Sequence, residues 1–396
     1  MGQILKYIEE NNEGNFHCYR TKKFSLDDNN VDTISSENSD QDTIPNDTTG
    51  KIAESNAKRV DSILISKTLI ENTPPYFKYF LDGSRHTYKV DDIAIGNKIF
   101  PIVAGQIVVG CCHRPDRDTF KKAELRRRII LSLPKQFHTK GKIEDFSRRY
   151  CEKLNEHLKV TNRFVANSGI EIDRIVFYLT DGPTVGDASD KNRFKNSAIA
   201  QIQNDMTDEE QLMVNELCNK KLLNDESWLI KDGSLQYNPH FSSIDSAQWN
   251  NMRTNYQYVV GVSKSFDPEL LKNYEGKKMS QIIAGLKPFE RTKAYKYPSP
   301  HSNGMHFAVW YLRLRNSNFR ETNFSDIVKC EMLMHNSSQP ISTDTINAIS
   351  ANLIREAYPV CFGNDSRWAN HLYPIYLTET FCKSQYIDSN IFLSLF

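Results

Sequence analysis

The pattern of apolar and polar positions divides the chain into strands and helices in an order typical of a mixed α/β protein. Aromatic and β-branched runs predict strands at residues 76–81, 86–90, 93–95, 98–112, 170–180, 228–230, 256–263, 305–315 and 327–334. Apolar residues at helical spacing predict helices at residues 53–69, 142–160, 196–222, 343–358 and 377–387. Because the early strands follow one another with short connections, they are expected to form an antiparallel meander.

Polarity also predicts the domain organisation. Residues 1–25 form a short mixed segment, and residues 26–56 are rich in Asp, Asn, Ser and Thr. The latter composition cannot repay the entropy lost on ordering, which predicts a flexible linker or loop. Residues 57–396 then form the main domain.

An Asp-Gly-Ser motif occurs twice, each time at the end of an apolar run. Asp82-Gly83-Ser84 follows residues 76–81, and Asp232-Gly233-Ser234 follows residues 228–230. A carboxylate leaving a buried strand, followed by Gly where the backbone turns, is expected at the edge of a sheet. Two such carboxylates on neighbouring strands can share a divalent metal ion. The alternative is an ordinary turn dipeptide, and Asp181-Gly182 is a third copy that competes for any role in a site.

Composition limits the class of protein. The chain has 396 residues, of which 39% are hydrophobic, so a sizeable core is expected. Its net charge is +1, so a nucleic-acid partner would need a local basic surface, and residues 121–128 hold the densest positive cluster. The eight cysteines have no Cys-x-x-Cys or zinc-like spacing. We expect reduced thiols in a cytoplasmic protein, with no membrane span.

Clustered carboxylates favour a particular chemistry. On adjacent elements they can hold divalent ions that activate water and stabilise the leaving oxygen of a phosphodiester. Mg²⁺ and Mn²⁺ suit such all-oxygen ligands, and no histidine cluster favours zinc. The RNase H-like architecture offers this arrangement on a strand meander followed by a helix and a later strand.

Six short motifs in order resemble the NurA nucleases. They are residues 81–84 (LDGS), 230–235 (IKDGSL), 260–265 (VGVSKS), 307–315, 328–331 (VKCE) and 373–377 (YPIYL). The resemblance runs from about residue 76 to the end, with extra material at about 115–200.

This resemblance implies an RNase H-like mixed sheet with flanking helices and a helical insertion at 115–200. It implies a deoxyribonuclease that hydrolyses phosphodiester bonds with Mn²⁺ or Mg²⁺. It further implies a homodimer that works on DNA with a hexameric HerA-type ATPase. Residues 1–25, which lie outside the resemblance, are a candidate segment for docking that partner. Either DNA end processing for repair or defence against phage would suit such a complex.

Site residues follow from matching motif to motif. Asp82 and Asp232 match the two metal-binding aspartates. The intervening helix should supply a glutamate, for which Glu210 is preferred because it precedes the apolar stripe of that helix at helical spacing. Glu209 and Glu216 are the alternatives.

Two further positions match the pattern. Lys264 matches a lysine that can contact the scissile phosphate or an acid beside it, and its alternative is a surface lysine. Tyr373 matches a tyrosine that can touch the substrate phosphate, and its alternative is a core tyrosine.

The sequence also departs from the family pattern. Eight residues after the tyrosine, the usual histidine is replaced by Phe381, for which His371 is a possible substitute. Glu331 has an acid's place on a late strand, either in a salt bridge or at a metal.

Two alternatives to an active nuclease remain. The departure at Phe381 suggests a catalytically weakened DNA-binding or ATPase-docking subunit of the same complex. The Asp-Gly motifs near strand ends also occur in kinases and ATPases of the actin and sugar-kinase type, but the absence of Gly-rich phosphate loops argues against that class.

Overall fold

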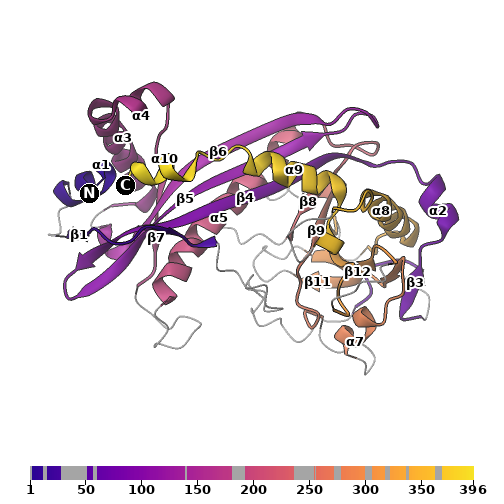
Figure 1. The fold of residues 1–396 in the computed structure, drawn as a ribbon. Helices are drawn as coiled ribbons and strands as arrows, with labels where there is room; N and C mark the ends of the chain where they lie inside the picture. Colours follow the sequence, from indigo (N-terminus) through magenta and orange to yellow (C-terminus); the bar gives the residue numbers. More distant parts are fainter. Residues whose placement is uncertain are drawn as a thin grey trace.

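The computed structural model describes residues 2–11, 16–27, 51–56, 60–138, 141–180, 192–235, 254, 256–271, 278–298, 306–316, 322–335, 339–361 and 368–396. In this part of the chain a long mixed β-sheet has helices on both faces (Figure 1). The mixed α/β class predicted from the sequence is therefore confirmed.

The sheet is built around a central group of parallel strands. In chain order the main strands are β3 (Ser62–Leu64), β4 (Phe77–Ile95), β5 (Lys98–His113), β6 (Lys121–Pro134), β7 (Arg174–Tyr178), β8 (Trp228–Asp232), β9 (Val259–Ser263), β10 (Glu290–Thr292), β12 (His306–Arg313) and β13 (Ile327–Leu333). Their order across the sheet is β3-β10-β12-β13-β9-β8-β4-β5-β6-β7. The short strands β1 (His17–Tyr19) and β2 (Phe24–Ser25) pair with β4, and β11 (Tyr295–Pro298) pairs with β12.

Strand direction changes at β4. The strands β4, β5 and β6 are antiparallel to one another, which confirms the meander. In contrast, β8 runs parallel to β4, and β9 runs parallel to β8. The C-terminal ends of β8 and β9 therefore lie next to each other, and the end of β8 adjoins the first part of β4, where Leu81 pairs with Lys231.

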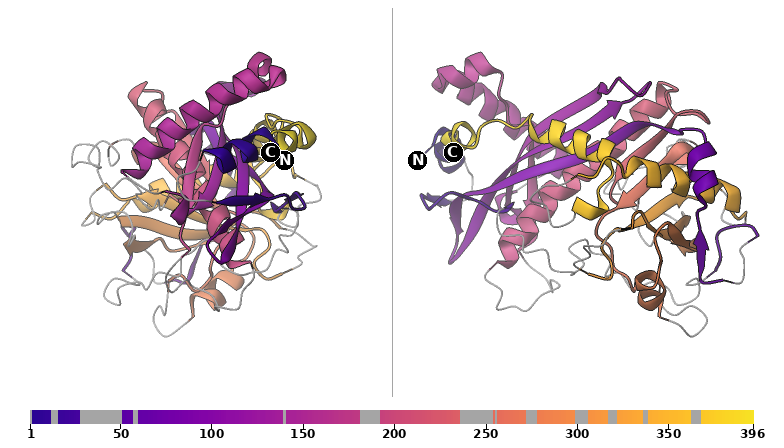
Figure 2. Two further views of the ribbon diagram at one scale, coloured as in Figure 1. Left: turned by 90° about the vertical axis from the view of Figure 1, so that its left-hand side faces the viewer. Right: turned by 45° about the vertical axis from the view of Figure 1, so that its right-hand side comes forward.

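Helices cover both faces of this sheet (Figure 2). They are α1 (Gln3–Glu10), α2 (Lys67–Asn72), α3 (Ile143–Thr161), α4 (Arg163–Ser168), α5 (Arg193–Asn219), α7 (Met279–Ala284), α8 (Thr343–Glu356), α9 (Tyr373–Lys383) and α10 (Ser389–Ser394). Met213 of α5 belongs to the same core as Leu81, whereas Ile375 of α9 belongs to a second core with Phe80. Because adjacent residues of a strand point to opposite faces, α5 and α9 cover opposite faces of β4.

Two local predictions are wrong. The predicted break after Asp82 is absent, because Gly83 pairs with Val109 inside one continuous strand, β4. The predicted helix at residues 53–69 is replaced by β3 and the short α2. Leu64 has the spacing of a helical core position, yet it is 63% exposed. It lies on β3, which pairs with β10 and is the edge strand of the sheet.

Several element predictions are confirmed, among them the helices at α3, α5 and α8 and the strands at β5, β12 and β13. The predicted linker at 26–56 falls mostly outside the described residues. At its two described ends, Asp27 binds Thr87 of β4, and Glu54 is buried against Arg291 of β10. The third Asp-Gly, at 181–182, also lies outside the described part.

The two ends of the chain meet. Ile4 of α1 donates a backbone hydrogen bond to Leu395 O, 3.4 Å away, and Figure 1 shows α1 beside α10. All eight cysteines are free thiols, as predicted. Within the described residues, none of the helices combines the length and apolar character that a membrane span requires.

Candidate functional site

The structure brings Asp82 and Asp232 to matching positions on neighbouring strands. Leu81 of β4 pairs with Lys231 of β8 in a parallel register, so the next residue on each strand is an aspartate. Two residues before these aspartates, Phe80 on β4 and Ile230 on β8 belong to the same hydrophobic core. Because side chains alternate, both aspartates point to this same face, which α9 covers.

The two Asp-Gly-Ser motifs differ in backbone. Asp232 ends β8, and Gly233 has a φ of +84°, a left-handed conformation that favours glycine. Asp82 instead lies within β4 and is buried. The turn predicted for this motif therefore exists only in the second copy.

Lys264 joins the aspartates from the next parallel strand. It follows β9, and its Nζ lies 2.9 Å from Asp232 Oδ2. The same Nζ lies 3.3 Å from Oε2 of Glu379, a residue of α9. Its side chain is only 9% exposed, so the ammonium group is largely removed from water.

Glu379 is a member of this cluster that the motif comparison missed. Besides Lys264, its carboxylate contacts Lys383 Nζ at 2.7 Å and lies 3.9 Å from His371 Nδ1. A signal was present in the sequence, because Glu379 lies four residues after Ile375 and three before Cys382, which are both buried. An acid on the buried stripe of a helix indicates a buried partner.

Burial and charge act against each other in this cluster, which consists of Asp82, Asp232, Lys264 and Glu379. Burial, together with the charge of Asp232, raises the pKa of Asp82 well above its ordinary value. Burial alone would raise the pKa of Glu379, but Lys264 and Lys383 outweigh it and lower that pKa to about 2. Burial likewise opposes the charge of Lys264, yet Asp232 and Glu379 raise its pKa.

Asp82 is the unsatisfied member of the cluster. Its Oδ2 is buried and has no hydrogen-bond partner among the described residues. A buried polar atom without a partner is costly, so native structures usually retain one for a reason such as a bound ion.

Glu210 lies on the other face of β4. Its carboxylate lies 2.8 Å from Lys231 Nζ, and a Cβ added at Gly83 would overlap Glu210 Oε1. Gly83 follows Asp82 in β4, and Lys231 precedes Asp232 in β8. Because successive positions of a strand face opposite sides of the sheet, Glu210 lies on the side of the sheet away from the two aspartates. Burial raises the pKa of Glu210, although Lys231 opposes the shift. Its role at a metal stays a prediction.

The two alternative glutamates of α5 have partners elsewhere. Glu209 accepts hydrogen bonds from Arg126 and Arg128 of β6, at 2.9 and 3.2 Å. Glu216 accepts one from Arg126 at 2.9 Å. The basic run that contains these arginines is thus partly neutralised by α5.

The end of the family pattern maps onto α9. Tyr373 begins this helix and is partly buried, and the described residues show no hydrogen bond or ion pair between it and the two aspartates. The Phe381 ring faces Gly110 of β5, and His371 is buried. The role of Tyr373 in binding phosphate stays a prediction.

Glu331 holds the turn after Asp232. Its buried carboxylate accepts hydrogen bonds from Ser234 Oγ at 2.8 Å and from the backbone nitrogen of Leu235 at 2.7 Å. It is also ion-paired with Lys329 Nζ at 2.8 Å. Of the two roles considered for Glu331, the structure shows the salt bridge.

Removing the Ser234 hydroxyl tests this turn. We expect Ser234→Ala to lower the free energy of unfolding by about 1–2 kcal/mol, because a hydrogen bond to a buried carboxylate is lost. Chemical denaturation measures the change, with the exposed Ser265→Ala as the matched control. Equal values for the two variants would show that the Ser234 bond to Glu331 contributes nothing.

A divalent ion fits part of this arrangement. Asp82 and Asp232 offer two neighbouring carboxylates, and the unpaired Asp82 Oδ2 is a suitable oxygen ligand. Within the described ranges, however, no three acidic, histidine or cysteine side chains converge closely enough to hold a metal ion. The ammonium group of Lys264 lies between Asp232 and Glu379 instead.

Comparison with known proteins adds one structural likeness. No family model and no curated protein matches the chain. Among solved structures, the chain is similar to the crystal structure of the NurA nuclease from Sulfolobus solfataricus, with 10% sequence identity and a TM-score of 0.37. The match covers 80% of this chain and 83% of that chain.

Proposed function

We propose that this chain is a divalent-metal-dependent DNA nuclease with an RNase H-like arrangement of acids. The observation that carries the proposal is the meeting of Asp82 and Asp232 at matching positions of two parallel strands. The unpaired, buried Oδ2 of Asp82 supports it, because a metal ion would satisfy that atom.

Asp82 and Asp232 would hold Mn²⁺ or Mg²⁺. Glu379 is a further carboxylate on their face of the sheet, linked to Asp232 through Lys264, whereas Glu210, the glutamate expected from the sequence, lies on the other face. When bound, such an ion activates water and stabilises the leaving oxygen of a phosphodiester. Lys264 balances the charge of the acids, and a lysine here can also contact a phosphate oxygen. Tyr373 is proposed as a further contact to phosphate.

The partners follow from the sequence resemblance. We propose that the chain acts as a homodimer with a hexameric HerA-type ATPase that moves DNA, in DNA end processing or defence against phage. A net charge of +1 supports dependence on a partner, since autonomous DNA binding usually relies on excess basic charge.

The second candidate is a catalytically weakened DNA-binding or ATPase-docking subunit. It is favoured by Phe381, which puts an aromatic ring beside Gly110 where the family pattern has a histidine. Such a subunit would keep the fold and the ATPase contact without cleavage.

Metal removal separates the two candidates. Purified protein with linear or circular DNA is expected to cleave with Mn²⁺ or Mg²⁺ and to stop when EDTA is added. Adding the ATPase at moderate salt is expected to increase the rate. Cleavage that persists in EDTA would refute the metal-dependent nuclease, and absence of cleavage even with the ATPase would favour the docking subunit.

A further inference from the structure

The ammonium group of Lys264 lies between two of the three acids of the cluster. Its Nζ lies 2.9 Å from Asp232 Oδ2 and 3.3 Å from Glu379 Oε2. These contacts reach it from two directions, since Asp232 belongs to the sheet and Glu379 to the helix packed on that sheet. A compact cation bound by carboxylates from two elements has the surroundings of a bound metal ion.

Charge balance explains why a cation is required here. Three carboxylates, those of Asp82, Asp232 and Glu379, gather where water has little access. Buried carboxylates of like charge repel one another unless a cation lies among them. Lys383 also contacts Glu379, but its side chain is 58% exposed, so water screens its charge.

The unpaired oxygen of Asp82 shows that Lys264 does not satisfy the whole cluster. Asp82 Oδ2 is buried without a hydrogen-bond partner in the described part of the chain, although the charges of Asp232 and Lys264 both act on the Asp82 carboxyl group. An ammonium group carries one positive charge and three N–H donors at fixed angles. A divalent ion carries two positive charges and coordinates several oxygens, so it could also bind the free oxygen of Asp82.

We propose that Lys264 is a resident counter-cation, which holds the acids together without metal and which a divalent ion must displace from Asp232. This proposal rests on the proposed function, because it assigns the same carboxylates to the metal. Displacement would free the ammonium group from Asp232 at the moment the metal binds. The released ammonium group of Lys264 would then be able to contact a phosphate oxygen of DNA.

Metal binding without DNA tests the exchange. We expect Lys264→Met to bind Mn²⁺ about tenfold or more tightly than the wild type by calorimetry, because no internal cation competes. Its Tm in EDTA should fall, and Mn²⁺ should raise that Tm more than it raises the wild-type Tm. Lys264→Arg, which keeps a cation, and Lys383→Met, which removes an exposed one, should stay within about twofold of the wild-type Kd.

A second measurement uses the unaltered protein and does not depend on the stability of a variant. Acylation of lysine amines, read by mass spectrometry, should be slow at Lys264 without metal and increase severalfold with Mn²⁺. Exposed lysines such as Lys67, whose side chain is 88% exposed, should not change.

The outcomes separate this proposal from the proposed function. Unchanged or weaker Mn²⁺ binding by Lys264→Met would overturn the exchange, as would constant acylation of Lys264 or failure of both proteins to bind Mn²⁺. If the exchange is observed but no DNA is cleaved, only the nuclease proposal fails. If metal-dependent cleavage occurs while the Mn²⁺ affinity of Lys264→Met is unchanged, only the exchange fails.

Discussion

Replacing Asp82 with asparagine is expected to abolish DNA cleavage while making the metal-free protein more stable. Asparagine has the size of aspartate but no charge, so the proposed site would lose a metal ligand. We expect cleavage with Mn²⁺ to fall by at least about a thousandfold, the scale of losing a central charged group from an active site.

The gain in stability follows from the pKa of Asp82. Burial and the charge of Asp232 raise this pKa above its ordinary value of 3.8, so the ionised carboxylate costs free energy in the folded state. Above pH 3.8, Asp82→Asn removes this cost, and we expect the free energy of unfolding in EDTA, measured by chemical denaturation, to be higher for the variant than for the wild type.

The pH dependence has a definite sign. Between pH 3.8 and the raised pKa, the folded wild type binds more protons at Asp82 than the unfolded chain does. The free energy of unfolding of the wild type should therefore fall as pH rises through this window, relative to Asp82→Asn. Below pH 3.8 the two proteins should converge.

The matched control for Asp82→Asn is Asp145→Asn, which alters an exposed aspartate of α3 that pairs with Arg148. It should leave both cleavage and stability near the wild-type values. Asp82→Asn protein that is folded and still cleaves DNA would refute the site as placed. A loss of stability in EDTA would show instead that ionised Asp82 stabilises the fold.

The sequence predicts the site most successfully where it depends on strands. Asp82 and Asp232 each follow an apolar run, and those runs are β4 and β8, which pair in the register that brings both acids together. The motif does not show that β4 continues past Asp82. That continuation depends on the ladder with β5, where Gly83 pairs with Val109, and a ladder between distant residues leaves no local signal.

Contacts made by helix packing are harder to predict. Glu379 reaches Lys264 only because α9 packs over the face that carries Phe80 and Ile375. Spacing on α5 correctly predicted that Glu210 is buried. The spacing did not predict on which face of the sheet Glu210 lies. Helices cover both faces of β4, and the periodicity of α5 does not show which face that helix covers.

Residues 53–69, the region that contains β3, show how tertiary contacts override helical spacing. Residues 53–69 have apolar residues at helical intervals, yet Ala53 donates a backbone hydrogen bond to Ala294 O at 2.8 Å and Ile65 donates one to Phe289 O at 2.9 Å. Between these two contacts, Glu54 is buried beside Arg291. A charged residue within a polar segment carries no sign of a distant partner, so this ion pair was not predicted.

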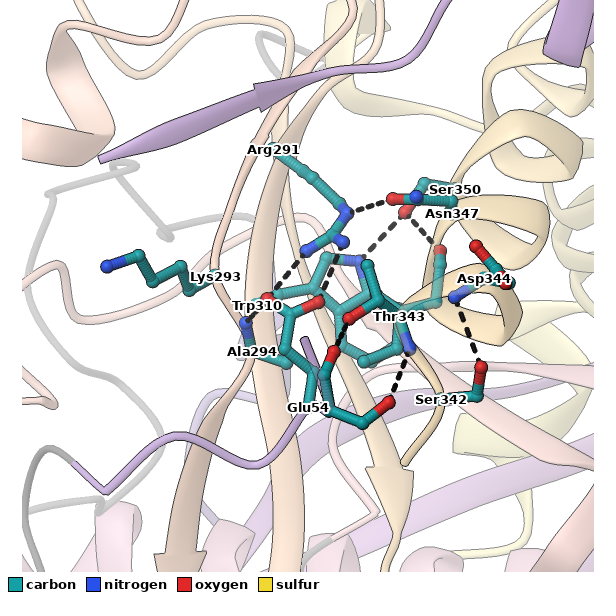
Figure 3. Close-up of polar contacts among 12 residues, drawn as sticks. Glu54, Arg291, Lys293, Ala294, Trp310, Ser342, Thr343, Asp344, Asn347 and Ser350 are labelled. Atoms are coloured by element: carbon teal, nitrogen blue, oxygen red, sulfur yellow. Dashed lines mark hydrogen bonds and ion pairs between the residues drawn. The ribbon is translucent and has the colours of Figure 1, made fainter. Parts of the chain in front are cut away.

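Replacing Glu54 with alanine is expected to be among the most destabilising single changes in the chain. Glu54 and Arg291 are both fully buried at the side chain, and the guanidinium binds the carboxylate through two hydrogen bonds of 2.8 and 3.2 Å (Figure 3). The same carboxylate accepts a hydrogen bond from the backbone nitrogen of Ala294, and Arg291 Nε donates a hydrogen bond to Asn347 Oδ1 of α8. This pair therefore ties residues 51–56 to β10 and α8.

Glu54→Ala leaves the guanidinium of Arg291 buried without its counter-ion, and we expect the free energy of unfolding to fall by about 3–5 kcal/mol. Chemical denaturation of the single variants and of Glu54→Ala/Arg291→Met measures the coupling. The double variant should be less destabilised than Glu54→Ala, because the unpaired charge has been removed and an apolar side chain fills the space. Glu54→Gln should lie between wild type and Glu54→Ala, since its amide oxygen can still accept from Ala294. If the double variant were as destabilised as the sum of its single changes, the cost would come from lost packing, and the buried charge of Arg291 would not be its cause.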